Sequence, residues 1–367
     1  CYCLGITQID PIAYNLPFER FMCSHNQYWP NIDLDVEKDG HKLLLNYLIN
    51  KYGEDHVADV IAPTNLNDST VRQLARDFDL TMEECAPLHH VLGRLGVHGC
   101  AIAMGKDKVG ACVPIVVVSG RQISLYDCVQ MENAGLTRLD VLDVKALTRL
   151  HTVVDLIRER KGEEIDVYAI NLNDKQTLRA FEYGNTDEIP FFDASDIKRM
   201  LMYLLSINFE TLVEVLSFCI FKNKGQDAYS FKKVSNKVID SCSPISIIQA
   251  RQQGDNSIDI FQEEIMDKMC SMADFSADDS DLVRKALCRD ASEYLDSFKQ
   301  NFMMGGLKNG YTLNELQDVW ETWYQNRTHY FFKSHAVCYT LMAYWMMYLK
   351  VHYAEEFNEV MSAIDKK

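Results

Sequence analysis

The sequence has no Cys-x-x-Cys pair, and its twelve cysteines are scattered singly apart from Cys1 and Cys3. Structural zinc sites and disulfide frameworks usually show such pairing, so neither is indicated here. Many free thiols are typical of a reducing compartment, and we therefore expect the protein to be cytoplasmic.

Three further features are missing. Neither phosphate-binding glycine pattern occurs, Gly-x-x-x-x-Gly-Lys-[Ser/Thr] or Gly-x-Gly-x-x-Gly. The most apolar late run, residues 336–349, is too short to span a bilayer and is followed at once by Lys350 and His352. A net charge of −16 argues against a protein that binds nucleic acid through an overall positive charge. A local basic groove is still compatible with this net charge. We expect no membrane partner.

Two aspartates, one residue apart, stand in the otherwise apolar stretch 30–36. On a strand, Asp33 and Asp35 project from the same face, because side chains alternate with period two. Neighbouring carboxylates repel each other, and hard divalent cations such as Mg²⁺ prefer oxygen ligands. The pattern therefore indicates a metal-binding strand, and the alternative is a polar edge strand whose aspartates face water.

A third aspartate, Asp140, lies in the apolar segment 139–142 directly after Arg138 and Leu139. Burying a lone carboxylate is costly unless it is paired or bound to metal. If this strand lies beside 30–36, three carboxylates converge on a site for two Mg²⁺ ions, with Mn²⁺ as an alternative. The competing interpretation is that Arg138 or a nearby lysine simply balances Asp140. Asp143 is interpreted as a solvated or capping residue.

The hydrophobic pattern predicts a mixed α/β region to about residue 165, followed by an α-rich region. Glycines punctuate the first region, and Gly53 is expected to end a helix over 41–52. Predicted strands are 30–36, 56–62, 100–104, 113–118, 122–126 and 136–142, with helices at 70–78, at a short segment ending near Gly93, and at 144–161. Later helices are predicted at 174–183, 194–204, 209–221, 243–252, 258–272, 279–288, 290–303, 312–325 and 335–350.

Basic residues of the α-rich region gather in small groups, in part beside aromatic residues. Such interleaving suits phosphate contacts combined with stacking on bases. The alternative is that each group is a solvated helix face, and that His335 is structural. The groups comprise Lys222 with Lys224, Lys232, Lys233 and Lys237; Arg284, Lys285 and Arg289; and Arg327, Lys333 and His335 around the aromatic run 330–332.

The order of these segments resembles the catalytic alpha subunit of bacterial DNA polymerase III, the C-family replicative polymerases, nearly end to end. The stretch 31–35 (Asn-Ile-Asp-Leu-Asp) matches the family's Pro-Asp-Ile-Asp-x-Asp motif, and 134–142 resembles its Gly-Leu-x-Lys-x-Asp-Phe-Leu strand. The further segments that carry the likeness are 4–12, 16–21, 51–58, 93–99, 260–266, 282–287, 332–336 and 354–357.

The resemblance implies an α/β (α+β) polymerase-beta-like nucleotidyltransferase palm followed by an α-rich fingers domain. The palm would comprise 1–62 and 94–165, a much reduced thumb-like insertion 63–93, and the fingers 166–367. Asp33, Asp35 and Asp140 take the catalytic and metal-binding roles. Contacts to nucleotide or DNA phosphates fall to Arg138, His98, Lys222, Arg284, Lys285, Lys333 and His335.

The implied activity is DNA-directed DNA synthesis: two-metal transfer of dNTPs to a primer 3′ end during replication. Primer–template DNA, dNTPs and other replication proteins are the implied partners. This sequence departs from the family pattern in three places. The segment between Ala62 and His98 is short, and residue 97 is a valine where the family has lysine. The family's triphosphate-binding Gly-Ser loop, expected just before Cys1, is absent from the sequence. Because the chain begins with cysteine and not methionine, it is interpreted as a piece of a longer protein or a processed product. One alternative function is an eroded polymerase relic acting as a binding or scaffold module, and another is nucleotidyl transfer to a different acceptor.

Overall fold

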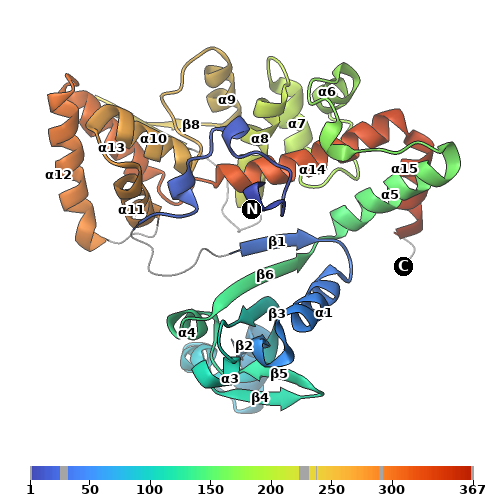
Figure 1. The fold of residues 1–367 in the computed structure, drawn as a ribbon. Helices are drawn as coiled ribbons and strands as arrows, with labels where there is room; N and C mark the ends of the chain where they lie inside the picture. The colour runs from blue at the N-terminus through green and yellow to red at the C-terminus, as the bar shows by residue number, and fades with distance from the viewer. Residues whose placement is uncertain (1, 25–31, 223–230, 237, 289–291, 365–367) are drawn as a thin grey trace. The chain divides into compact units, whose positions relative to one another are not determined.

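The computed structural model describes residues 2–24, 32–222, 231–236, 238–288 and 292–364 (Figure 1). The side chains of 219–222, 292–293 and 364 are not described. The chain forms two compact units: residues 26–148 are the first, and residues 1–25 together with 149–367 are the second. Residues 1–25 therefore group with the helical part of the chain, whereas the predicted domain boundaries would assign them to the palm.

The first unit is built on a mixed six-stranded sheet with the order β1-β6-β3-β2-β5-β4. β1 is parallel to β6, while β3 is antiparallel to both β6 and β2. All six predicted strands are present, but β3 begins much earlier than predicted and includes Gly93, where a helix end was expected. The strands are β1 (Ile32–Val36), β2 (Val57–Asn65), β3 (Leu92–Met104), β4 (Ile115–Val118), β5 (Arg121–Ser124) and β6 (Thr137–Asp143).

Helix α1 (Gly40–Tyr52) covers one face of this sheet. Its Leu45 and Leu48 pack with Ile102 of β3 and with Leu139 of β6. Gly53 ends the helix with φ +98°, as predicted. At its other end the backbone N–H of His41 donates to Asp143 Oδ1 at 3.3 Å, which agrees with the capping role, one of the two roles expected for Asp143.

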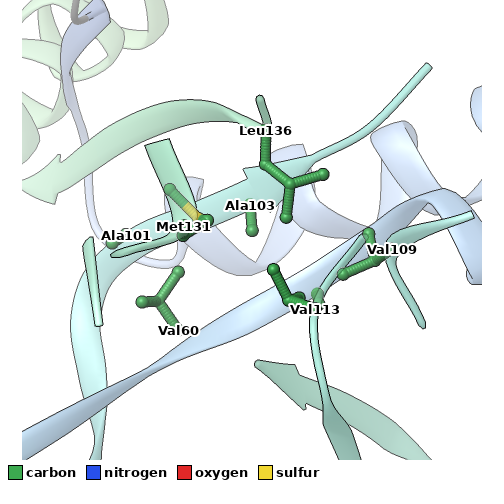
Figure 2. Close-up of a cluster of buried hydrophobic side chains, with 8 residues drawn as sticks. Val60, Ala101, Ala103, Val109, Val113, Met131 and Leu136 are labelled. Carbon is green, nitrogen blue, oxygen red and sulfur yellow. The ribbon is translucent and has the colours of Figure 1, made fainter. Parts of the chain in front are cut away.

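The opposite face is covered by two short helices that were not predicted, α3 (Val109–Cys112) and α4 (Cys128–Asn133). Figure 2 shows the resulting core, in which Met131 of α4 lies over Ala101 and Ala103 of β3. Val60, Val109, Val113 and Leu136 complete it. Helices this short give almost no periodic signal, although Asp127 and Gln130 form a capping box at the start of α4.

Between β2 and β3 lie α2 (Asp68–Asp77) and the 3₁₀ helix η5 (Ala86–His90). The N-cap of α2 is Asn67, whose side chain accepts the Thr70 N–H at 2.8 Å. Asp68 or Ser69 was expected there, and this prediction is wrong because both already lie inside the helix. Val71, Ala75 and Cys85 form a small core of their own.

The second unit is mainly helical, and each helix predicted for it is present. They are α5 (Lys145–Lys161), which begins in the first unit, α6 (Lys175–Glu182), α7 (Ser195–Tyr203), α8 (Phe209–Lys222), α9 (Pro244–Gln252), α10 (Gln262–Ala273), α11 (Ala277–Cys288), α12 (Ser292–Lys308), α13 (Leu313–Gln325) and α14 (Lys333–His352). The hairpin of β7 (Phe231–Ser235) and β8 (Val238–Cys242) and the last helix α15 (Ala354–Ile364) were not predicted. α10 begins four residues later than expected, because Phe261 forms a parallel bridge with Phe331.

Helix α14 explains the apolar run near the end of the chain. Tyr344, Met346 and Met347 are fully buried within the second unit. A helix that the protein surrounds in this way is apolar on most of its sides. In the part of the chain that the structure describes, no helix has the length and apolar character needed to cross a membrane.

Gly305 allows α12 to approach the end of α10 closely. A Cβ added at Gly305 would overlap the backbone carbonyl of Ala273, at the end of α10. We expect Gly305→Ala to lower the free energy of unfolding by about 1–3 kcal/mol, because this overlap outweighs the better helix propensity of alanine. Urea unfolding measures the change. Asn301→Ala, on an exposed position of the same helix, serves as the control and should change stability little. An unchanged or higher stability of Gly305→Ala would show that the two helices are not in close contact.

Candidate active site

The strand register brings the three predicted aspartates to one face of two neighbouring strands. Asp33 of β1 is the register partner of Asp140 of β6, and Asp35 is opposite Leu142. Figure 1 shows β1 lying beside β6. Because paired residues on adjacent strands share a face and the strands lie about 4.8 Å apart, the carboxylates of Asp33 and Asp140 are near neighbours.

Alternation along the strands determines which face this is. Ile32, Leu34 and Val36 pack with the core beneath α1, so Asp33 and Asp35 project from the other side. On the same side, Asp140 is the register partner of Ala101, a member of the core beneath α4. The carboxylates therefore lie on the face of the sheet that carries α4.

Arg138 lies between two carboxylates at this face. Its Nε is 3.2 Å from Asp140 Oδ2 and 3.2 Å from Glu132 Oε1 of α4. Although burial lowers the pKa of Arg138, the charge of Asp140, a hydrogen bond with Cys128 and the charge of Glu132 raise it on balance. Burial raises the pKa of the Cys128 thiol, against the opposing effect of Arg138. The interpretation that Arg138 balances Asp140 thus has a direct contact behind it.

Glu132 was missed from the sequence. Cys128 and Glu132 are four residues apart, so one face of α4 presents both to Arg138. The available signal was this spacing next to the aspartate-bearing strand, in a helix too short to be recognised by periodicity.

The donor chemistry of the three aspartates suits Mg²⁺, because each supplies hard carboxylate oxygens from neighbouring positions of a rigid sheet. Their side chains do not close around a cation. Among residues 2–24, 32–222, 231–236, 238–288 and 292–364, no group of three or more His, Cys, Asp or Glu side chains is arranged to hold a metal ion. Residue types and register therefore fit a divalent ion, whereas the side-chain positions would have to change to bind it.

His98 belongs to a different feature of the first unit. Its Nδ1 accepts the backbone N–H groups of Cys100 and Ala101, at 3.3 and 3.0 Å, where the pairing of β3 with β2 is irregular. It lines a cleft of about 330 Å³ with Asp59 and Arg121, and none of the three aspartates lines this cleft. Burial raises the pKa of Asp59, although Arg121 Nη2 lies 2.6 Å from Asp59 Oδ1 and opposes the shift. The structure thus gives His98 a local structural contact and does not bring it into the aspartate group.

In the second unit, Arg284 and Lys285 share one buried carboxylate. Arg284 Nε donates to Asp281 Oδ1 at 2.8 Å, and Arg284 Nη1 donates to Gln262 Oε1 at 2.7 Å. Lys285 Nζ lies 2.7 Å from Asp281 Oδ2. Asp281 is only 1% exposed and Arg284 is 5% exposed. Their predicted contacts to phosphate would therefore compete with an internal ion pair.

A second buried acid, Glu263, contacts Lys333 and Arg20, and His335 lies beside the ring of Phe332. The Lys333 backbone N–H donates to Glu263 Oε2 at 3.0 Å, and Arg20 Nε lies 3.6 Å from Glu263 Oε1. The Arg20 guanidinium stacks over Phe332 at 4.7 Å, and the His335 ring lies 5.3 Å from the same ring. Burial raises the pKa of Glu263, while the Lys333 N–H and Arg20 oppose this rise.

Four predicted residues are thereby gathered within the helical unit, together with Arg20. We call these five residues the basic cluster: Arg20, Arg284, Lys285, Lys333 and His335. Arg20 was not predicted as a site residue, although it lies in segment 16–21, one of the segments that resemble the family. The side chain of Lys222 lies outside the described residues, as do Lys224, Lys237 and Arg289.

Comparison with known proteins gives two matches to family models. Residues 1–94 match the bacterial DNA polymerase III alpha NTPase domain, and residues 146–310 match the bacterial DNA polymerase III alpha subunit finger domain. Among curated relatives, the DNA polymerase III subunit alpha of Aquifex aeolicus is 25% identical over 435 residues, which covers 100% of this chain and 37% of the relative.

Two further relatives give the same result. The DNA polymerase III subunit alpha of Ureaplasma parvum is 26% identical, with 98% of this chain and 41% of the relative covered. The protein of the same name from Campylobacter jejuni is 25% identical, with 97% and 34% covered. The chain thus spans roughly two fifths or less of the length of these relatives.

Proposed function

Because the chain belongs to the bacterial DNA polymerase III alpha family, we propose that it is the core of a DNA-directed DNA polymerase. It would add dNTPs to a primer 3′ end during replication, on a polymerase-beta-like nucleotidyltransferase palm followed by helical fingers. The observation that carries the proposal is the register of β1 and β6, which aligns Asp33 with Asp140 and leaves Asp35 on the same face.

Asp33, Asp35 and Asp140 would hold two Mg²⁺ ions, or Mn²⁺ in their place. When bound, the metals would lower the pKa of the primer hydroxyl and neutralise charge on the leaving pyrophosphate. The protein's own part is to keep the three aspartates at fixed backbone positions on two hydrogen-bonded strands. Arg138, beside Asp140, supplies positive charge for the phosphates of the incoming nucleotide.

DNA would be contacted by positive charge from the helical unit. The basic cluster combines cations with the aromatic ring of Phe332, an arrangement that suits both phosphate contacts and base stacking. His98 and Lys222 remain proposed phosphate contacts on the strength of the family resemblance alone. Primer–template DNA, dNTPs and other replication proteins are the proposed partners, and the cytoplasm is the proposed location.

The rival function is that of a binding or scaffold module derived from a polymerase. It is favoured by one specific observation, because Arg284 and Lys285 are both engaged with Asp281 and Arg138 with Asp140. A relic would keep such internal pairs as parts of its fold, whereas a polymerase must release some of them to bind phosphate.

Primer extension separates the two functions. The full chain is incubated with a primed DNA template, dNTPs and Mg²⁺ or Mn²⁺, and the Asp35→Asn variant is prepared in the same way. A polymerase core extends the primer only with metal present, and the variant does not. Equal extension by both proteins would trace the signal to a contaminating polymerase. No extension by the natural full-length protein would favour the relic.

A further inference from the structure

Arg138 bridges two acids that belong to different structural elements. Asp140 lies two residues on in the same strand, β6, and Glu132 projects from α4. The side chains of all three are partly buried: Arg138 is 22% exposed, Glu132 33% and Asp140 18%. At these exposures the pairs are only partly screened by water, so the position of the guanidinium matters for any other cation near Asp140.

A cation bound at Asp140 and a guanidinium 3.2 Å from the same carboxylate would repel each other strongly. We propose that Arg138 is a built-in counter-cation that exchanges with the divalent ion at Asp140, and that Glu132 retains Arg138 when it leaves Asp140. The inference rests on the proposed function, since it assumes that Asp140 is a metal ligand.

The second partner is what makes exchange feasible. Glu132 offers an arginine displaced from Asp140 a second carboxylate in a partly buried place, where loss of an ion pair is costly. Glu132 is held beside the strand by α4, which is anchored by its capping box and by burial of Met131. Arg138 can therefore keep one ion pair in either state. Once released from Asp140, its guanidinium is available to a nucleotide phosphate.

The test measures Mn²⁺ binding by the full chain without nucleotide, by electron paramagnetic resonance of free Mn²⁺ or by calorimetry. Arg138→Gln removes the competing cation and should tighten binding about tenfold, within the usual range of coupling energies. Glu132→Gln removes one of the two carboxylates that contact Arg138 and should weaken binding roughly three- to tenfold. In the double variant, Glu132→Gln should have little effect, because Arg138 is no longer there to be retained.

A control and a reference variant complete the design. Glu83→Gln removes the same charge from an exposed position of the same unit and should leave Mn²⁺ affinity unchanged. Asp35→Asn identifies the site, because it should abolish the binding that the other variants modulate. Circular dichroism confirms that each variant is folded.

The outcomes separate the two proposals. Glu132→Gln could weaken Mn²⁺ binding equally in the wild type and in the Arg138→Gln variant. Glu132 would then act by direct attraction of the metal ion, and the proposed exchange with Arg138 would be wrong. It is also wrong if Arg138→Gln fails to tighten binding. If neither the wild type nor Arg138→Gln binds Mn²⁺, or if Asp35→Asn binds it normally, the metal site itself is wrong and the proposed function fails with it.

Discussion

Asp33→Asn is expected to reduce primer extension by roughly a thousandfold or more, since an asparagine keeps the shape of the side chain but loses the charge that a divalent cation requires. Asp33 is the register partner of Asp140, so it is the residue best placed to share a metal with it. The measurement is the single-turnover rate of nucleotide addition at saturating Mg²⁺.

The same change should leave the fold intact. Like charges directly across neighbouring strands are unfavourable, so removal of one carboxylate should leave stability unchanged or raise it by up to about 1 kcal/mol. Lost activity without lost stability would indicate a functional site rather than a structural one. The matched control is Asp143→Asn, which removes a charge from the same pair of strands but retains an acceptor for the His41 N–H. Activity of Asp33→Asn within tenfold of the wild type would remove Asp33 from the catalytic machinery.

Asp281→Ala is expected to destabilise the protein by about 3–5 kcal/mol, because it leaves a buried guanidinium without its carboxylate. Asp281 Oδ1 lies 2.6 Å from Arg284 Nη2, and Asp281 Oδ2 lies 2.7 Å from Lys285 Nζ. Arg284 would keep its hydrogen bond to Gln262, which cannot neutralise its charge. Urea unfolding of the full chain measures the effect, with both units monitored because they need not unfold together.

Two companion variants give the result a specific meaning. Asp296→Ala, at an exposed position of α12, should change stability by less than about 0.5 kcal/mol. Asp281→Asn retains a hydrogen-bond acceptor but not the charge. Its loss of stability should therefore lie between the losses caused by Asp281→Ala and Asp296→Ala. If Asp281→Ala lowers the free energy of unfolding no more than Asp296→Ala does, then the side chain of Arg284 reaches solvent easily. It would then be freely available for the phosphate contact predicted from the sequence.

Several features of the fold could be predicted because they are encoded within a few consecutive residues. Period-two alternation in 32–36 put Asp33 and Asp35 on one face, and Gly53 ended α1 because it adopts a positive φ without strain. The helices α5 to α14 follow from their apolar spacing, whereas α15 was not predicted. Short elements could not be predicted in this way, because α4 and the strands β7 and β8 have too few residues to show a hydrophobic period.

The basic residues show where such reasoning ends. Arg284 and Lys285 look alike in the sequence as solvated or phosphate-binding cations, yet both contact Asp281, and Arg284 is buried. Arg20 is more than 240 residues away from Glu263 in the chain, and the sequence around either residue does not indicate that they pair. Ion-pair partners are selected by how distant segments pack, so charge patterns alone do not identify them.

The sequence by itself determined the chemistry of the candidate site: three carboxylates in apolar strands, two of them on a common face, with an arginine next to the third. Only the tertiary structure decided that β1 lies beside β6 in a register that aligns Asp33 with Asp140, and that Glu132 of α4 shares Arg138 with Asp140. The physical reason is range. Backbone periodicity acts between neighbouring residues, whereas strand order and the choice of ion-pair partner depend on burying apolar faces contributed by segments about a hundred residues apart.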